Sequence, residues 1–366
     1  MVDLIDALAA RSVEARVVLP EEGSVVSALQ ARMVPYVVYH YRPWTRKTPL
    51  PRWDRFLKKP LAHALRALKL SRLIRRWRCH VIVTNTLTVC EGALAARILR
   101  LPHITYAREF GDLDHDLHFE WNPSLSMRFL NLLSARVVFN SAALANHYRR
   151  QVPPAQARVI YNAVSVPAAS LAQSEPSEYG ATFSCVLVGN VEPGKGHEDA
   201  ICAIANLSRR GTPVNLKLIG AGSSAGQERL QRLIDGLGVS DLVEMVGYVP
   251  DPQGFFRQAD VALMCSRMEA FGRVTVEGMK QGTPVIGARS GGTSEIIHDR
   301  FNGFLYTPGD ARELADKIEE LRRDRDGARQ MGERARHFAM EKFSLERYGS
   351  EFLDLLNEVT EARAGG

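Results

Sequence analysis

Glu269-Ala-Phe-Gly-Arg-Val-Thr-Val-Glu277 is the stretch that decides the fold, because it sets two carboxylates around a Phe-Gly turn with seven residues between them. We expect Glu269 to lie in a loop after an apolar run, and Glu277 to lie in a helix that opens after Gly272. An ionised carboxylate accepts strong hydrogen bonds, so both glutamates suit the hydroxyl groups of a sugar or a ribose. The N–H groups at a helix start attract an anion such as a diphosphate. One short segment could thus hold all three parts of a nucleotide sugar.

The residues that follow this segment extend the pattern. A helix, a glycine stop and a short apolar strand are predicted for Gly278-Met-Lys-Gln-Gly-Thr-Pro-Val-Ile286. A second glycine turn and a second helix are predicted for Gly291-Gly-Thr-Ser-Glu-Ile-Ile297. The order of these motifs resembles the donor-site signature of family 4 ("group 1") retaining glycosyltransferases, which have a GT-B fold. The matching order is Ser266…Glu269-Ala-Phe-Gly…Glu277…Gly-Thr-Pro-Val…Gly-Gly…Glu295…Asn302-Gly-Phe. The resemblance covers residues 80 to 345 well and the first 80 residues poorly.

Short apolar strands alternate with helices along the whole chain, which favours parallel α/β layers. We therefore predict two Rossmann-like domains, which the resemblance implies face each other across a cleft. Residues 1–163 would form the acceptor-side domain, residues 164–344 the nucleotide-sugar-binding domain, and residues 345–366 a helix that crosses back to the first domain. The predicted linker and hinge is residues 162–179, which are rich in Ala, Ser and Pro.

The start of the first domain departs from the family pattern. A Rossmann-like domain should open with a strand and a glycine-rich turn. This chain opens with a predicted helix, Asp3–Arg11, followed by the strand Ala15–Leu19, so the usual first strand and Gly-rich loop are absent. Our hypothesis is that the sequence is an N-terminally shortened version of a longer enzyme. The alternative is that another segment fills the gap, and an in-frame stop codon directly upstream would defeat the hypothesis.

The resemblance implies roles for residues of the second domain. Lys195, in the glycine-rich turn Val188-Gly-Asn-Val-Glu-Pro-Gly-Lys195, would place its ammonium group on the donor diphosphate. Asn190 stands where the family usually has Arg, and Arg273 is a candidate replacement for that cation. The predicted catalytic residues are Lys195, Glu269 and Arg108. The predicted donor-binding residues are Gly189, Asn190, Lys195, Tyr248, Val249, Glu269, Phe271, Gly272, Arg273, Val274 and Glu277.

Within this set, Glu269 would bind hydroxyl groups of the donor sugar, and Glu277 would bind the ribose. Phe271 and Gly272 would supply backbone groups near the sugar and diphosphate. The base would lie near Tyr248 and Val249, although a packing role for the Tyr248 ring at a strand end is an equal alternative.

In the first domain, Arg108 ends a predicted strand on the acceptor side, where many family members carry His. A residue there can contact the donor sugar or an anionic acceptor. His103 is expected to pack within the strand, and Ala163 replaces a usual Gly, which removes a freely permitted positive φ. Asp112, Asp114, His115, Asp116 and His118 could mimic a metal site, but their irregular spacing favours a solvated turn, and GT-B transferases generally need no metal.

Leu218-Ile-Gly-Ala-Gly-Ser-Ser-Ala225 formally fits a dinucleotide fingerprint. The acidic residue expected about 20 positions later should end a second strand, whereas Glu244 lies within its strand. A plain strand-to-helix turn is therefore favoured over NAD binding, and no cofactor is expected.

Charge divides unevenly along the chain. Residues 1–163 hold 24 Lys or Arg and 12 Asp or Glu, a net +12, whereas the remainder is net −6 and gives +6 for the whole chain. Residues 42–78 hold 13 basic residues and one acidic residue together with Trp44, Trp53 and Trp77, a mixture that suits an anionic membrane surface. A solvated basic face is the alternative, and nucleic acid is disfavoured because no recognised module surrounds the patch.

The sequence contains no run of 18 apolar residues and no signal-peptide n-region. Its five cysteines are odd in number and form no CxxC pair, which indicates reduced thiols in a cytoplasmic protein. We expect a cytoplasmic location, with peripheral contact to the inner membrane face as a possibility to test.

The predicted function is transfer of a hexose from a UDP- or GDP-linked donor, with retention at the anomeric carbon. The acceptor would be a lipid-linked or cell-envelope glycan in polysaccharide biosynthesis. Two rivals stay open. One is a catalytically silent binding or scaffold protein of the same fold, which the absent first loop, Asn190 and Ala163 favour. The other is a nucleotide-sugar epimerase, against which the Glu-x7-Glu spacing with Lys195 argues.

Overall fold

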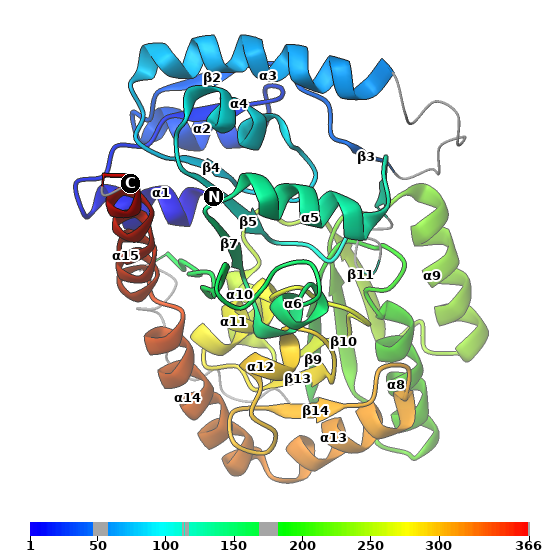
Figure 1. Cartoon of the computed structure of the whole chain (residues 1–366). Coiled ribbons are helices and arrows are strands. Elements are labelled where there is room, and N and C mark those ends of the chain that lie inside the picture. The colour runs from blue at the N-terminus through cyan, green and yellow to red at the C-terminus, as the bar shows by residue number, and fades with distance from the viewer. Residues whose placement is uncertain (47–57, 112, 114–116, 168–181, 365–366) are drawn as a thin grey trace. The chain divides into compact units, whose positions relative to one another are not determined.

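The computed structural model describes residues 1–46, 58–111, 113, 117–167 and 182–364 (Figure 1). The chain divides into two compact units: unit 1 is Met1–Ala163 with Leu345–Gly366, and unit 2 is Val164–Ser344. Most of the predicted linker lies outside the described residues, as do Trp53 and residues 112 and 114–116 of the acidic loop.

The described residues of unit 1 form three small sheets. A four-stranded parallel sheet has the order β4-β5-β7-β8, a two-stranded parallel sheet joins β1 and β2, and an antiparallel pair joins β3 and β6. The elements are α1 (Val2–Ala9), β1 (Val17–Leu19), α2 (Ser24–Ala31), β2 (Tyr36–Val38), β3 (Thr45–Arg46), α3 (Lys58–Trp77), β4 (Ile82–Thr84), α4 (Glu91–Leu99), β5 (His103–Ala107), β6 (His118–Phe119), α5 (Pro123–Leu133), β7 (Arg136–Phe139), α6 (Ala142–His147), β8 (Ala157–Val159) and α15 (Leu345–Ala364).

The two parallel sheets of unit 1 share their covering helices. Helix α1 packs Ile5 against the β1–β2 sheet and Leu8 into the cluster that contains Tyr106 of β5. On α3, Leu70 and Ile74 form a cluster with residues of both β1 and β4. Because no strand pairing joins β1 to β4 among the described residues, the two sheets are separate hydrogen-bonded units within one apolar layer.

The C-terminal helix α15 packs within unit 1. Its apolar residues Tyr348, Phe352 and Leu355 are buried in the same cluster as Ile104 and Tyr106 of β5. This spacing of three and four residues places one face of α15 on the sheet. The Tyr348 hydroxyl lies 3.1 Å from the Tyr106 hydroxyl, so a polar contact supplements the apolar one.

Trp44 corrects one part of the sequence interpretation. Its ring is 2% exposed and lies edge-on to Phe119 and Trp121, and its indole N–H donates to Leu87 O (2.7 Å). Trp44 is therefore part of the core of unit 1 and cannot contribute to a membrane-facing surface. A satisfied N–H is the usual condition for burying Trp.

Unit 2 is built on one six-stranded sheet with the order β11-β10-β9-β12-β13-β14, in which every pairing is parallel. The chain fills one side first, from β9 to β11, and then returns to the other side of β9. The elements are β9 (Ser184–Val188), α8 (His197–Arg209), β10 (Asn215–Ile219), α9 (Ser224–Leu237), β11 (Val243–Gly247), α10 (Gln253–Gln258), β12 (Val261–Met264), α11 (Arg273–Lys280), β13 (Val285–Ala288), α12 (Thr293–Ile296), β14 (Phe304–Tyr306), α13 (Ala311–Arg323) and α14 (Arg325–Lys342).

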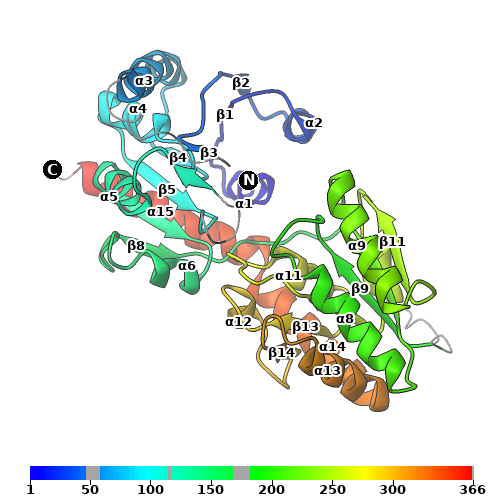
Figure 2. The same cartoon turned by 90° about the vertical axis from the view of Figure 1, so that its right-hand side faces the viewer.

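Helices cover both faces of this sheet. Residues of α8, α9 and α13 form one apolar cluster with Cys185, Leu187 and Leu263, and Figure 2 shows α8 and α13 lying side by side. Helix α11 lies on the opposite face, where Gly278 approaches Ala262 of β12. Successive strand residues point to opposite faces, and the central strands β12 and β13 are buried on both. Lys217 of β10 and Glu244 of β11, nearer the edge of the sheet, are exposed.

All five cysteines are free thiols, with Cys90, Cys185 and Cys265 buried and Cys79 and Cys202 half-buried. Burial raises the pKa of each thiol above its ordinary value. A thiolate is the reactive form of cysteine, so none of the five has the electrostatic setting of a nucleophile.

Candidate active site

The candidate site of unit 2 lies where the chain reverses its direction across the sheet, between β9 and β12. In open parallel sheets, ligands bind at the carboxyl ends of the strands beside this switch point. Three loops meet there: the loop after β9, the loop after β12 and the loop after β13. Direct hydrogen bonds join them, from Arg267 N to Gly194 O (2.7 Å) and from Gly292 N to Glu269 O (2.8 Å).

Two glycines allow these loops to meet. Gly196 has φ +73°, and a Cβ atom added there would lie 2.0 Å from Cys265 O. Gly291 has φ +47°, and its Cβ would lie 2.2 Å from Glu269 O. Both positions require glycine for the left-handed backbone and for the close approach. The two glycines thereby fix the backbone positions from which the Lys195 and Glu269 side chains extend.

Lys195 and Glu269 form an ion pair across the switch point. Lys195 Nζ donates to Glu269 Oε2 at 3.1 Å, and the two side chains are 24% and 22% exposed. The charged groups are half-buried and remain accessible to a ligand. The structure therefore brings together two of the three predicted catalytic residues.

The start of α11 adds a second positive element beside Glu269. Gly272 is the N-cap residue with φ +96°, and Val276 N donates to Gly272 O (3.4 Å) at the end of the first turn. The earlier N–H groups have no carbonyl one turn before them in the helix. This end of α11 carries the positive end of the helix dipole, which favours an anion.

Glu277 lies one turn inside α11 and is paired with Arg273. Arg273 Nε donates to Glu277 Oε1 at 2.8 Å, and the side chains are 48% and 14% exposed. The guanidinium suggested as a substitute for the missing cation at position 190 is thus engaged by Glu277 in this structure. Asn190 itself is exposed.

The other predicted donor-binding residues lie at the same edge of the sheet. Gly189 directly follows β9, and its carbonyl oxygen lies 3.2 Å from His197 Nε2. Phe271 buries its ring against Phe343, with 5.6 Å between centroids, so only its backbone remains for a ligand. Val274 is half-buried in the first turn of α11.

Tyr248 and Val249 follow β11, two strands away from β9. The Tyr248 side chain is 71% exposed. The ring therefore does not pack at the strand end, which was the alternative to a role near the base.

The turn Leu218–Ala225 connects β10 to α9 as predicted, and it serves packing. A Cβ atom on Gly220 would lie 2.0 Å from Gly189 O, and one on Gly222 would lie 2.6 Å from Val191 Cβ. Val191 N also donates to Ala221 O (2.7 Å). The glycines of this fingerprint-like stretch thus let the turn approach the loop that carries Lys195.

Arg108 lies in unit 1, at the carboxyl end of β5, whereas Lys195 and Glu269 belong to unit 2. Its guanidinium donates to Asn85 Oδ1 and to Asn162 Oδ1, both at 3.1 Å. Ala163 has no positive φ, so the replacement of Gly by Ala at this position introduces no left-handed residue.

His103 is 1% exposed, and its ring nitrogens lie 2.8 Å from Thr84 Oγ1 and 2.9 Å from Ser134 Oγ. Burial lowers the pKa of His103 to about 3. The imidazole is therefore neutral and structural, in agreement with the predicted strand packing.

A buried polar cluster in unit 1 was missed from the sequence. His63 Nδ1 lies 2.8 Å from Glu91 Oε1, which also accepts from Arg66 Nε (2.8 Å), and Cys90 is adjacent. His63, Cys90 and Glu91 could supply metal ligands, but the Arg66 cation in the same cluster opposes a second cation. The spacing of His63 and Arg66 on one helix face was the available signal.

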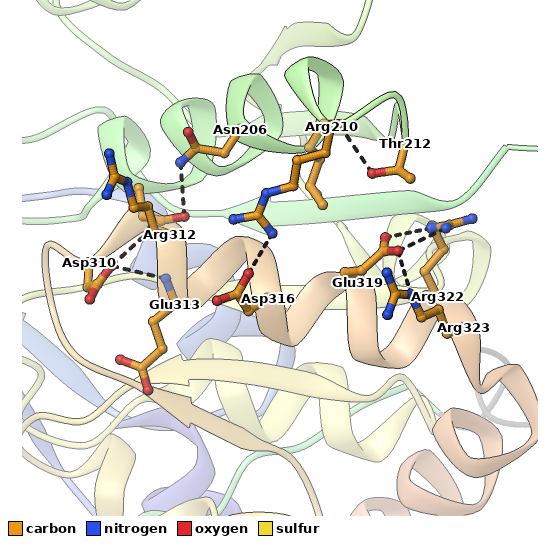
Figure 3. Close-up of polar contacts among 12 residues, drawn as sticks. Asn206, Arg210, Thr212, Asp310, Arg312, Glu313, Asp316, Glu319, Arg322 and Arg323 are labelled. Carbon is orange, nitrogen blue, oxygen red and sulfur yellow. Dashed lines mark hydrogen bonds and ion pairs between the residues drawn. The ribbon is translucent and has the colours of Figure 1, made fainter.

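A surface cavity of about 520 Å³ lies away from the switch point, between the end of α8 and α13. Figure 3 shows Arg210 pointing to Asp316, and Glu319 pointing to Arg322 and Arg323. These side chains form ion pairs with each other at the surface, where such pairs contribute little to the stability of the fold. The cavity therefore lacks an unpaired group that would select a ligand.

Comparisons with known proteins match both halves of the chain. Residues 1–166 match the family model described as Glycosyltransferase Family 4, and residues 175–338 match the model described as Glycosyl transferases group 1. The N-acetyl-alpha-D-glucosaminyl L-malate synthase of Bacillus anthracis is 31% identical over 50% of this chain and 48% of its own length. The lipopolysaccharide core biosynthesis glycosyltransferase LpsE of Rhizobium meliloti (strain 1021) is 33% identical over 46% of this chain and 48% of its own length.

These alignments span about half the length of the curated relatives. Among solved structures, Anabaena Alr3699/HepE in complex with UDP superposes with a TM-score of 0.79 at 22% identity, covering 98% of this chain and 94% of that chain. The likeness confirms the predicted GT-B fold with two Rossmann-like α/β units.

Proposed function

The chain belongs to the group 1 glycosyltransferases of family 4, and on this premise we propose that it transfers a hexose from a nucleotide-sugar donor to a glycan acceptor, with retention at the anomeric carbon. The observation that carries the proposal is the Lys195–Glu269 pair, 3.1 Å apart beside the start of α11. Cationic and anionic groups at one switch point match a donor that carries both phosphates and hydroxyl groups.

Lys195 and the start of α11 would bind the donor diphosphate. The Lys195 ammonium group supplies a full positive charge, and the N–H groups after Gly272 supply oriented partial charges. Negative charge grows on the diphosphate as the bond to the sugar breaks, so these groups stabilise the transition state more than the ground state.

Glu269 and Glu277 would position the two hydroxyl-bearing parts of the donor. Glu269 sits in the loop after β12 and would accept from the sugar, and Glu277 would accept from the ribose. Holding both ends fixes the anomeric carbon relative to the acceptor, which is the positioning contribution to catalysis. The donor would carry UDP or GDP, and UDP is the nucleotide present in the Anabaena structure named above.

The proposed transfer step needs no side chain of the protein to remove the proton from the acceptor hydroxyl group. The bond from the anomeric carbon to the diphosphate oxygen breaks, and the acceptor oxygen bonds to that carbon on the same face. The acceptor proton passes to the departing phosphate oxygen. We propose this route because it needs only the donor and the acceptor, and because the two carboxylates of the site, Glu269 and Glu277, are each held by a cation, Lys195 and Arg273.

For the acceptor, we propose a lipid-linked or cell-envelope glycan, and for the location the cytoplasmic face of the inner membrane. The relative LpsE is named for lipopolysaccharide core biosynthesis, which supports this class. None of the described helices has the length and apolar character needed to span a bilayer. Any membrane contact by the described residues would therefore be peripheral.

The exposed face of helix α3 is the feature that favours the proposed membrane contact. The helix has no acidic residue, and its exposed face carries Leu61, Leu65 and Leu68, which are 63%, 53% and 39% exposed. These leucines lie at i, i+4 and i+7 on one stripe. The same stripe continues with the exposed basic residues Lys69, Arg72, Arg75 and Arg76. Apolar and basic residues on one exposed face suit an anionic lipid surface.

Vesicle sedimentation tests this contact. We expect the chain to bind vesicles of phosphatidylcholine with phosphatidylglycerol more than pure phosphatidylcholine, and replacing Leu61 and Leu65 with Ser should weaken binding. Leu132→Ser is the matched control, because Leu132 is 80% exposed on another helix. Equal binding to both vesicle types would remove the support for a membrane contact.

A second candidate function is nucleotide binding without catalysis. The exposed Asn190 favours it, because the family usually places a phosphate-binding Arg there. A thermal-shift screen with UDP, GDP, ADP and their sugars tests the donor site. A donor assay for hydrolysis or transfer then separates the two functions, since a silent protein would bind a nucleotide and release no sugar.

A further inference from the structure

The carboxyl edge of the unit 1 sheet gathers one arginine and three asparagines. Arg108 directly follows β5, and Asn85, Asn140 and Asn162 follow β4, β7 and β8. Parallel strands end at the same edge of a sheet, which is where open α/β sheets bind their ligands. Each of these four residues thus follows a different strand, and together they form one polar cluster in which Asn140 and Asn162 are buried.

The Arg108 side chain is held by neutral partners. Its Nη1 and Nη2 atoms donate to Asn85 Oδ1 and Asn162 Oδ1, and its guanidinium carbon lies 5.1 Å from the centre of the Tyr106 ring. The Tyr106 hydroxyl donates to the same Asn162 Oδ1 at 2.6 Å. Asn140 Nδ2 donates to Arg108 O at 3.3 Å. The guanidinium is therefore fixed in place before any ligand arrives.

These contacts do not neutralise the positive charge. Among the described residues, which leave out Asp112, Asp114 and Asp116, no carboxylate pairs with Arg108. The neighbouring Glu109 turns elsewhere: it is 9% exposed and accepts from Thr86 Oγ1 and from Leu87 N (2.6 Å). Two of the five guanidinium N–H groups are used by the amides, so three remain for a ligand.

We propose that Arg108 binds an anionic group, a carboxylate or a phosphate, on the acceptor. A half-buried guanidinium that is rigidly held and lacks a counter-charge gains most from an anion, and its planar fork matches both groups. The donor diphosphate is assigned to Lys195 and α11, in the other unit. The inference therefore rests on the proposed function and names its acceptor class as acidic. Arg108 would select the acceptor and orient it for attack.

Saturation-transfer NMR on the full chain tests the proposal with three probes. Methyl β-D-glucuronoside and glucose 6-phosphate carry the two kinds of anion, and methyl β-D-glucoside is the matched neutral sugar. We expect at least one anionic probe to bind 10-fold or more tightly than the neutral one. Arg108→Gln should remove this preference, Arg108→Lys should retain part of it, and Arg150→Gln, at an exposed arginine, should leave it intact.

The thermal shift caused by UDP is read on the same samples. An unchanged UDP shift in the Arg108→Gln variant shows that this variant is folded and assigns the lost preference to the acceptor. The proposal is overturned if the neutral glucoside binds the parent chain as well as both anions do, or if Arg108→Gln keeps the preference. If Arg108→Gln reduces the thermal shift caused by UDP as much as it reduces anion binding, Arg108 acts on the donor side. That result would also overturn the proposal. A chain that never responds to nucleotides would refute the proposed function while leaving the anion preference to be judged separately.

Discussion

Lys195 Nζ lies 3.1 Å from Glu269 Oε2, although the two residues come from loops after different strands, β9 and β12. Each charge compensates the other in this pair. A diphosphate would compete with Glu269 for the ammonium group, and a sugar hydroxyl would compete with Lys195 for the carboxylate. A donor that presents both groups replaces the ion pair with two new contacts, which a phosphate or a sugar alone cannot do.

Removal of the Lys195 ammonium group should slow turnover more than it weakens binding. We expect Lys195→Ala to lower kcat about 100-fold, because the lost charge acts mainly on the leaving diphosphate. Steady-state transfer assays with varied donor separate kcat from KM. Lys217→Ala is the control, since Lys217 forms an exposed pair with Glu244 at 3.8 Å. A Lys195→Ala variant with the parent's kcat would rule out this role.

Loss of the Glu277 carboxylate should weaken nucleotide binding. A hydrogen bond to a charged group contributes about 1.5–3 kcal/mol, so Glu277→Ala should raise the Kd for the matching nucleoside diphosphate at least about 10-fold. Isothermal titration measures this change, with Glu244→Ala as the exposed control. If the affinity stays at the parent value, the ribose is bound elsewhere.

Two glycines in one loop offer a matched pair of variants. Gly194 and Gly196 both have positive φ, but a Cβ on Gly194 meets no atom within 4 Å, whereas one on Gly196 would lie 2.0 Å from Cys265 O. Gly194→Ala should therefore cost only the left-handed backbone strain, about 1–2 kcal/mol of unfolding free energy. Gly196→Ala must also displace the loop after β12 and should cost at least about 3 kcal/mol.

Urea denaturation compares the two variants, and UDP binding shows whether the loop has moved. Equal losses of stability in both variants would contradict the close approach of the two loops.

His103 should make stability depend on pH. Burial holds its pKa at about 3 in the folded protein, against about 6.5 in an unfolded chain. Between these values only the unfolded chain takes up the proton, so stability is complete above pH 6.5 and falls as the pH drops toward 3. At pH 5 the loss from this residue would be about 2 kcal/mol.

Urea titrations at several pH values measure this slope. The His103→Gln variant should show a flatter dependence between pH 7 and pH 5, and His118→Gln, at an exposed histidine, should keep the parent's slope. Parallel curves for parent and His103→Gln would show that another group causes the effect.

Regular α/β periodicity made much of the architecture predictable. Strands β9 and β12 are short apolar runs between turn residues, which is the strand signal that alternates with helices along the sequence. Strand β14 was missed, since Phe304–Tyr306 is only three residues long and follows the Asn-Gly turn directly. Three residues are too few to show the alternation or the apolar run by which a strand is recognised in a sequence.

The site was predictable as a set of residues but not as a set of contacts. The motif order singled out Lys195 and Glu269, and the family resemblance implied roles for them that stay predictions. It could not show that they pair with each other, or that Arg273 is engaged by Glu277, because rotamers and loop geometry decide these contacts. Trp44 illustrates the same limit: its basic neighbourhood suggested a surface, while cross-chain packing with Phe119 and Trp121 buries it.

The five shielded thiols have a practical consequence for studying this molecule. Burial keeps each native cysteine protonated at neutral pH, and maleimide dyes attack thiolates. A Tyr248→Cys substitution, at a side chain that is 71% exposed, would introduce a thiol that outcompetes them for the dye, so no native cysteine has to be removed. The label would then test the proposed position of the base, because a nucleotide bound beside residue 248 would change its fluorescence.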